Sequence, residues 1–167
     1  DYKVTGVQTC ALPICSLLKA VHVFLDANCP GGHHVFADSV NNGPWGRALT
    51  TELIPYLEKR FRLSPSPAGR FLTGHSSGGW SALWLQVRYP DLFGGAWPTS
   101  PDSVDFRNFT GVDIDNASNA YRTAAGDPIN LVREEGRNLL SFEQFARMEA
   151  VTGEYGGQLA SFEWVFS

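Results

Sequence analysis

A short glycine-serine turn between an apolar run and a helical pattern constrains the fold of this chain most strongly. Residues 74–78 read Gly-His-Ser-Ser-Gly, and the residues directly before them, 71–73, are Phe-Leu-Thr. Residues 81–87 continue with helical character until Tyr89-Pro90 ends the helix. This pattern predicts a buried strand, a tight turn with a strained serine backbone, and a helix that begins directly after the turn.

Ser76, at the centre of the turn, is the candidate nucleophile. A Gly-x-Ser-x-Gly pattern is weak evidence by itself, because in a chain with 17 glycines the pattern can arise by chance. The strand before it and the helix after it supply the context that the motif needs. Gly74 and Gly78 are expected to relieve crowding at the turn, and Gly79 relaxes it further. The alternative interpretation is a purely structural glycine turn.

The composition fits one globular domain. The chain has 167 residues, of which 43% are hydrophobic, enough for a substantial core. The net charge is −4 and no block of Lys and Arg occurs, so no nucleic acid is expected as a partner. No apolar run approaches the roughly 20 residues that cross a bilayer, and we expect no membrane span. The cysteines and histidines lack the spacing of a metal site, and no cofactor or metal is predicted.

Residues 1–15 are expected to lie outside the natural domain. Residues 4–14 resemble the translation of a common sequencing-library adapter. A signal peptide would show a basic start, an apolar centre and a cleavage site, which are missing here, whereas an N-terminal strand is the other alternative. We therefore predict an artefact segment over 1–15 and a truncated domain over 16–167. Because the true N-terminus is then missing, the sequence predicts no cellular localisation.

The remaining pattern alternates strands and helices. Strands are predicted over 17–27, 70–73 and 92–98, and helices over 48–61, 81–87 and 139–151. In the first of these helices, either Thr51 is the N-cap or Pro55 kinks the helix. The order strand, helix, strand, helix, strand predicts an α/β fold with a mostly parallel sheet and helices on both faces.

Ligands bind such sheets at the carboxyl ends of the strands. Asn28, Ser76 and residues 99–102 are all predicted to lie at those ends. Two aspects of a pocket there stay open. His33 and His34, in the long loop after the first strand, either line it or decorate the surface. Four aromatic side chains either form an acyl or aryl pocket or pack in the core: Trp45, Trp80, Trp97 and Phe106.

Four segments together resemble a known family: Leu25-Asp26-Ala27, residues 53–58, residues 71–80, and Tyr89-Pro90-Asp91-Leu92-Phe93. They are similar to the putative esterases of the α/β-hydrolase superfamily, the group that includes esterase D, enterochelin esterases and feruloyl esterases. The resemblance covers about residues 21–105. It implies a partial α/β-hydrolase fold and a serine esterase that hydrolyses small carboxylic esters through an acyl-enzyme.

The resemblance also implies roles for single residues. Ser76 matches the nucleophile, and the backbone N–H of Ser77 matches one donor of the oxyanion hole. The second donor is expected from the loop after an earlier strand, which points to Asn28, with Ala27 and Cys29 as alternatives. Such donors stabilise the negative charge that develops on the substrate oxygen.

The base that would activate Ser76 is missing from its expected place. In this superfamily an acid and then a histidine follow the serine, but no histidine follows Ser76. The acid is also open: Asp102 is one candidate, although the family usually takes this residue one strand later. His33 and His34 are weaker candidates for the base. We therefore expect an incomplete triad and an inactive fragment; the alternatives are a non-catalytic binding module or an acyltransferase.

Overall fold

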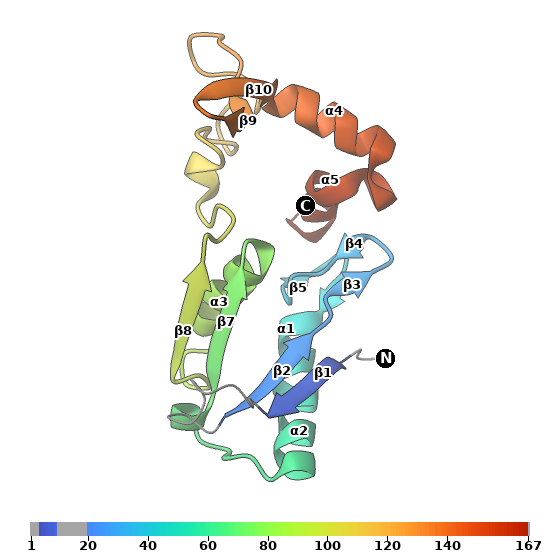
Figure 1. Cartoon of the computed structure of the whole chain (residues 1–167), viewed down its shortest axis with the longest axis vertical. Helices are drawn as coiled ribbons and strands as arrows, with labels where there is room; N and C mark the ends of the chain where they lie inside the picture. The colour runs from blue at the N-terminus through green and yellow to red at the C-terminus, as the bar shows by residue number, and fades with distance from the viewer. Residues whose placement is uncertain (1–3, 10–19, 167) are drawn as a thin grey trace.

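The computed structural model describes residues 4–9 and 20–166 (Figure 1). Its first part contains both helices and strands, in agreement with a mixed α/β composition. A second part, from residue 130 onward, carries two strands and two helices, and its last helix returns to lie beside the first part (Figure 1). No helix in the described part of the chain is both long and apolar enough to cross a membrane.

The predicted parallel pairing occurs at one place. β7 (Phe71–His75) pairs in parallel with β8 (Gly95–Thr99), in a register that sets His75 beside Thr99. The helix α3 (Ser77–Arg88) connects them, as a parallel crossover requires. Residues 70–73 and 92–98 were the predicted strands, so the second strand lies slightly later than expected.

The mostly parallel sheet is not what the structure has. Among the described residues the strands form five two-stranded sheets, and β7–β8 is the parallel one. β1 (Val4–Thr9) pairs antiparallel with β2 (Val21–Leu25). The long loop after β2 forms two hairpins, because its strands are too close in sequence to pair in parallel. They are β3 (Asn28–Cys29) with β4 (Gly32–His33), and β5 (Asp38–Ser39) with β6 (Gly43–Pro44).

Residues 45–61 form one continuous helical segment with a change of geometry in its middle. It consists of α1 (Trp45–Ala48), a π-helical stretch η2 (Leu49–Leu53) and α2 (Ile54–Phe61). Pro55 has no N–H and its ring would clash with the carbonyl one turn earlier, so the wider π-helical turn before it relieves the crowding. Thr51 is not the N-cap, since its hydroxyl donates to the Arg47 carbonyl at 2.8 Å.

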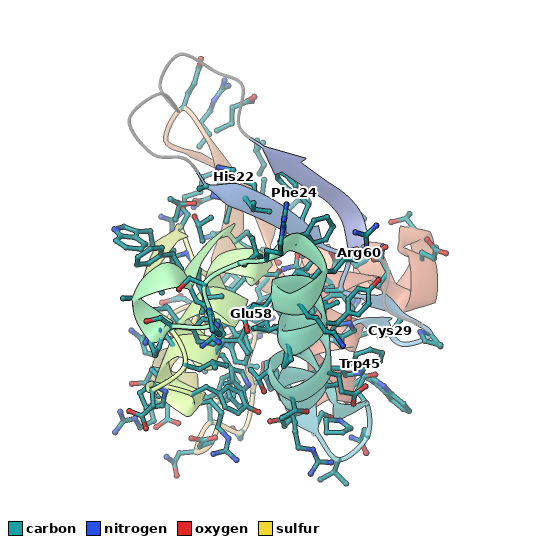
Figure 2. The ribbon with its side chains drawn as sticks, turned by 90° about the horizontal axis from the view of Figure 1, so that it is seen from below. His22, Phe24, Cys29, Trp45, Glu58 and Arg60 are labelled. Carbon is teal, nitrogen blue, oxygen red and sulfur yellow. The ribbon has the colours of Figure 1, made fainter. Side chains whose placement is uncertain are left out.

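The main core lies between this helical segment and α3. Its buried side chains are Leu49, Leu53, Leu57, Leu85 and Phe93. Val23, Leu25 and Leu72 pack against them from β2 and β7. Glu58 lies on the side of α2 that faces β7 and forms an ion pair with Arg70, which precedes that strand (Figure 2).

The other face of these strands is open in the described structure. Alternate residues on β2, β7 and β8 are exposed: Phe24 by 54%, Phe71 by 58% and Trp97 by 60%. Phe71 and Trp97 contact each other edge to face, with ring centroids 5.4 Å apart. The predicted helices on both faces are therefore not seen here.

The second part of the chain begins after a loop-rich stretch that contains the 3-10 turn η4 (Phe106–Asn108). Another 3-10 turn, η3 (Pro67–Gly69), lies earlier, directly before β7. β9 (Asn130–Glu134) and β10 (Arg137–Ser141) form an antiparallel hairpin, so the predicted helix over 139–151 begins later, as α4 (Phe142–Thr152). A capping box between Ser141 and Gln144 fixes this start.

The last helix closes a second, smaller core. η5 (Glu154–Gly156) leads into α5 (Gly157–Phe166). Phe162 and Val165 of α5 are buried against Val35 and Ala37, which lie between β4 and β5. The dense aromatic residues at the end of the sequence therefore pack onto the loop that follows β2, beside the β3–β4 hairpin (Figure 1).

Candidate active site

Ser76 occupies a strained turn between β7 and α3. Its φ of 53° and ψ of −122° lie in a region that side-chain-bearing residues rarely adopt. Hydrogen bonds on both sides hold it there: its N–H donates to the Thr99 carbonyl at 3.1 Å, and its own carbonyl accepts from the Trp80 N–H at 3.0 Å. The backbone thus has the form that the sequence pattern predicts for an elbow.

Of the two glycines of the motif, Gly74 has the steric role expected of it and Gly78 does not. A Cβ at Gly74 would lie 2.1 Å from the Gly78 carbonyl oxygen, so Gly74 is required by the close approach of the strand to the helix. A Cβ at Gly78 would meet no described atom within 4 Å, and Gly78 therefore has no steric reason to be glycine. Gly79 is tighter, because its Cβ would lie 3.1 Å from the Pro101 Cα.

Asp102 lies directly beside the elbow and bridges both of its serines. The Ser76 hydroxyl donates to Asp102 Oδ1 at 2.9 Å, and the Ser77 hydroxyl donates to Oδ2 at 2.7 Å. The Asp102 N–H also donates to the Ser76 carbonyl at 3.3 Å. Ser100, with a φ of 43°, turns the chain after β8 and so brings Asp102 to this position. The structure therefore joins Ser76 to the acidic residue that the sequence left open.

A cavity of about 740 Å³ adjoins this cluster. The β3–β4 hairpin, the elbow and the C-terminal segment with α5 each contribute to the wall of the cavity, and most of the residues that line it are polar. The lining residues are Asn28, Cys29, Gly32, His33, Ser77, Glu154, Gly157, Gln158 and Ser161. Ser77 lines it directly, and Ser76 adjoins it through the shared Asp102 carboxylate. The structure thus brings Asn28 and Ser77, both predicted as oxyanion donors, to one cavity.

The two backbone donors predicted for the oxyanion hole differ in their partners. Ser77 is the first residue of α3, where the backbone N–H has no acceptor within the helix. The Asn28 N–H instead donates to Asp26 Oδ1 at 3.0 Å. Asn28 is exposed on β3, and its side chain lies at the cavity.

His33 lies at the cavity, but within the described residues no hydrogen bond joins it to Ser76. Its ring contacts Phe162 edge to face at 5.4 Å, and its Nδ1 is buried with no hydrogen-bond partner in the described part of the chain. Burial lowers the pKa of His33, and the negative charge of Asp102 acts in the opposite direction. The imidazole is therefore neutral at pH 7.

The other histidines lie away from the cavity. His34 is 2% exposed and stacks on Trp45, with ring centroids 4.1 Å apart. Its Nδ1 accepts from the Phe36 N–H at 3.1 Å, and burial lowers its pKa to about 4. His75 Nδ1 lies 3.1 Å from the Thr99 hydroxyl, and His22 is exposed on β2 (Figure 2). His34 thus supports the loop structurally.

The four aromatic residues considered for an acyl pocket do not line the cavity. Trp45 packs on His34, and its indole N–H donates to the Asn42 carbonyl. Trp80 and Phe106 both pack against Phe166 of α5. Trp97 lies on the open sheet face. Within residues 4–9 and 20–166, no group of three or more His, Cys, Asp or Glu residues is arranged to hold a metal ion.

Sequence reasoning missed Gln158, which reaches the elbow from the last helix. Its Nε2 lies 3.2 Å from Ser77 Oγ and 3.4 Å from Asp102 Oδ2. No motif surrounds Gln158, and it is 81 residues from Ser77, so only the tertiary fold brings the two together.

Comparison with known proteins places these observations in a family. A family model described as Putative esterase matches residues 22–132, which is more than half of the chain. No curated protein matches the chain. The match includes most of β2, the β3–β4 hairpin, the elbow with Ser76, and Asp102. By this match, the chain belongs to the putative esterase family.

Proposed function

We propose that this chain carries the acyl-transfer site of a serine esterase of the α/β-hydrolase superfamily, with Ser76 as the nucleophile and a small carboxylic ester as the substrate. One observation carries the proposal: Ser76 has a strained elbow backbone, and its hydroxyl donates to the Asp102 carboxylate at 2.9 Å. A serine hydroxyl needs an acceptor for its proton before it attacks, and Asp102 is within direct reach.

The reaction follows from this arrangement. Ser76 Oγ attacks the acyl carbon while its proton passes to an acceptor, and the ester C–O bond breaks as the alcohol leaves with a proton. Water then adds to the acyl-enzyme and releases the carboxylic acid. An aspartate carboxylate is a weaker base than an imidazole, because its ordinary pKa lies about 2.6 units lower. Acylation with Asp102 as the acceptor is therefore slow.

The oxyanion hole is proposed to consist of the Ser77 N–H and a donor from Asn28. The place of Ser77 at the start of α3 and the position of both residues at one cavity support this assignment. Since the Asn28 N–H is engaged by Asp26, it must leave that carboxylate to bind a substrate oxygen. Each such donor that is well aligned lowers the barrier by about 3 kcal/mol.

A second candidate function is a binding module that does not turn over its ligand. It is favoured by one observation: among the described residues, no hydrogen bond joins Ser76 to an imidazole. An acyltransferase is a variant of the first function, since the same acyl-enzyme would pass its acyl group to an alcohol in place of water.

Labelling with a fluorophosphonate probe tests the proposal. The probe reacts with an activated serine, forming an O–P bond while fluoride leaves. We expect slow labelling of the wild-type chain, mapped by peptide mass spectrometry to Ser76, and none in Ser76→Ala. Equal labelling of Ser76→Ala would contradict the nucleophile, and complete absence of labelling in the wild type would favour the binding module.

The same experiment tests the base. Asp102→Asn should reduce labelling at least about tenfold, because it removes the charged acceptor. His33→Asn should leave the labelling rate within about twofold of the wild type. If His33→Asn labels as poorly as Asp102→Asn, the base is His33 and the direct Ser76–Asp102 transfer is wrong.

A further inference from the structure

We propose that Gln158 on α5 is a positioning residue of this site, whose side-chain amide holds the Asp102 carboxylate in the orientation that accepts the Ser76 hydroxyl. The inference rests on the proposed function, since it concerns the same nucleophile. It adds a residue from a segment beyond the family match, which ends at residue 132.

The two carboxylate oxygens of Asp102 have different hydrogen-bond partners. Oδ1 accepts from Ser76 Oγ at 2.9 Å. Oδ2 accepts from Ser77 Oγ at 2.7 Å and from Gln158 Nε2 at 3.4 Å. Because two donors from different elements hold Oδ2, the carboxylate is restrained about its Cβ–Cγ bond, and Oδ1 stays directed at Ser76.

Gln158 also acts on Ser77. Its Nε2 lies 3.2 Å from Ser77 Oγ, which is itself the donor to Asp102. The hydroxyl of Ser77 accepts from the amide and donates to the carboxylate, so the three groups form a closed set of hydrogen bonds. A neutral amide completes this set without placing a second negative charge beside Asp102.

The docking of α5 determines where Gln158 lies. Ser161, which is 1% exposed, accepts from the His33 N–H at 2.7 Å and donates to the His33 carbonyl at 3.2 Å. Gln158 and Ser161 are three residues apart and share a helix face, so anchoring Ser161 to the hairpin directs Gln158 into the cavity. α5 lies next to the β3–β4 hairpin in Figure 1.

A positioning role predicts a specific kinetic effect. Gln158 contacts Asp102 and Ser77, so its loss changes the orientation of the proton acceptor. Substrate binding should change little, whereas the rate of attack by Ser76 should fall. Loss of Gln158 should therefore lower the maximal rate of acylation and leave the half-saturating concentration unchanged.

Two variants and one control test the role in the full chain. Gln158→Met keeps the length but removes the donor, and Gln158→Glu keeps the shape but replaces the donor with a charge. Glu163→Gln is the control, since Glu163 is exposed on the same helix and does not line the cavity. The probe is the fluorophosphonate used above, with the labelling rate measured over a range of probe concentrations.

We expect Gln158→Met to lower the maximal labelling rate about tenfold, with the half-saturating concentration unchanged within about twofold. Gln158→Glu should lower the rate further at pH 7. Its rate relative to wild type at the same pH should rise as the pH falls toward 5, because a protonated carboxyl regains a donor. Glu163→Gln should label like the wild type.

Each contrary result overturns the role. A wild-type rate in Gln158→Met would show that the amide does not position Asp102, and a change confined to the half-saturating concentration would make Gln158 a probe-binding residue. Labelling that survives Ser76→Ala refutes the proposed function instead, so the two failures are distinguishable.

A second measurement needs no covalent probe. In the ¹⁵N-labelled chain, the Gln158 side-chain amide should exchange with solvent more slowly than in Asp102→Ala. Equal exchange in the two proteins would overturn the contact.

Discussion

At Ser76, the backbone and the side chain are constrained by different segments. The turn between β7 and α3 sets the backbone at a φ of 53°, whereas Asp102, 26 residues later, holds the hydroxyl. The first constraint could be predicted from the glycine-serine pattern, because the turn is local. The second could only be named as a possibility, since it depends on how the chain turns at Ser100 after β8.

The two glycines of the motif should respond differently to substitution. Gly74→Ala should destabilise the fold by at least about 3 kcal/mol, because its Cβ would lie 2.1 Å from the Gly78 carbonyl oxygen. Gly78→Ala should leave stability unchanged or raise it by up to about 1 kcal/mol, since alanine favours the helix and meets no described atom within 4 Å. Urea denaturation measures both, and equal losses would contradict the assignment.

Among the elements, those with a clear local pattern could be predicted and those set by tertiary packing could not. The strand–turn–helix around Ser76 is present as predicted. Residues 139–141 have apolar character that suits a helix, but they form β10 because β9 pairs with them and the Ser141 capping box starts α4 afterward. Pro55 indicated a disturbance in its helix, but the π-helical form of residues 49–53 was not foreseen.

Gln158 shows the same limit at the candidate site. Ser76, Ser77 and Asn28 were singled out from a motif and a family resemblance, and the last two line one cavity. The contribution of α5 depends on a hairpin contact made across 128 residues, between His33 and Ser161. No local pattern encodes such a contact.

The docking of α5 onto the hairpin should depend on Ser161. Ser161→Ala removes the acceptor of the His33 N–H and should destabilise the fold by about 1–3 kcal/mol, because that buried donor is left unpaired. Hydrogen–deuterium exchange should show lost protection in α5, with α3 and β7 unaffected. If α3 loses protection to the same extent as α5, the two parts of the molecule unfold together. The claim that α5 docks independently of the main core is then wrong.

Across the whole molecule, the described structure has a packed side and an open side. The helical segment 45–61 and α3 enclose the main core with β2 and β7, while Phe24, Phe71 and Trp97 remain exposed on the other face.

Residues 4–9 pair as β1 with β2, and the family match begins at residue 22, after them. That residues 1–15 are foreign to the natural domain stays a prediction.

Global stability should fall as the pH is lowered from about 6.5 to about 4. Burial lowers the pKa of His34 from its ordinary 6.5 to about 4, so the unfolded chain binds a proton in this range that the folded chain does not. The contribution of His34 is complete above pH 6.5 and decreases as the pH falls, by a total of about 3 kcal/mol. His33, also lowered by burial, acts in the same direction.

Urea denaturation of the wild type and His34→Asn at pH 7.5, 5.5 and 4.5 checks this dependence. The variant should be less stable at pH 7.5 but should lose less stability between pH 7.5 and 4.5. Parallel pH profiles for the two proteins would mean that His34 is not the responsible group.

The central claim, that Ser76 forms an acyl-enzyme, is tested most directly by trapping that intermediate. The chain is incubated with p-nitrophenyl acetate, quenched with acid, digested and mapped by mass spectrometry, with Ser76→Ala treated in parallel. The proposed site predicts an acetyl group on Ser76 in the wild type and none on the corresponding peptide of Ser76→Ala. Release of p-nitrophenol at equal rates by both proteins, with no acetyl group on Ser76, would contradict it.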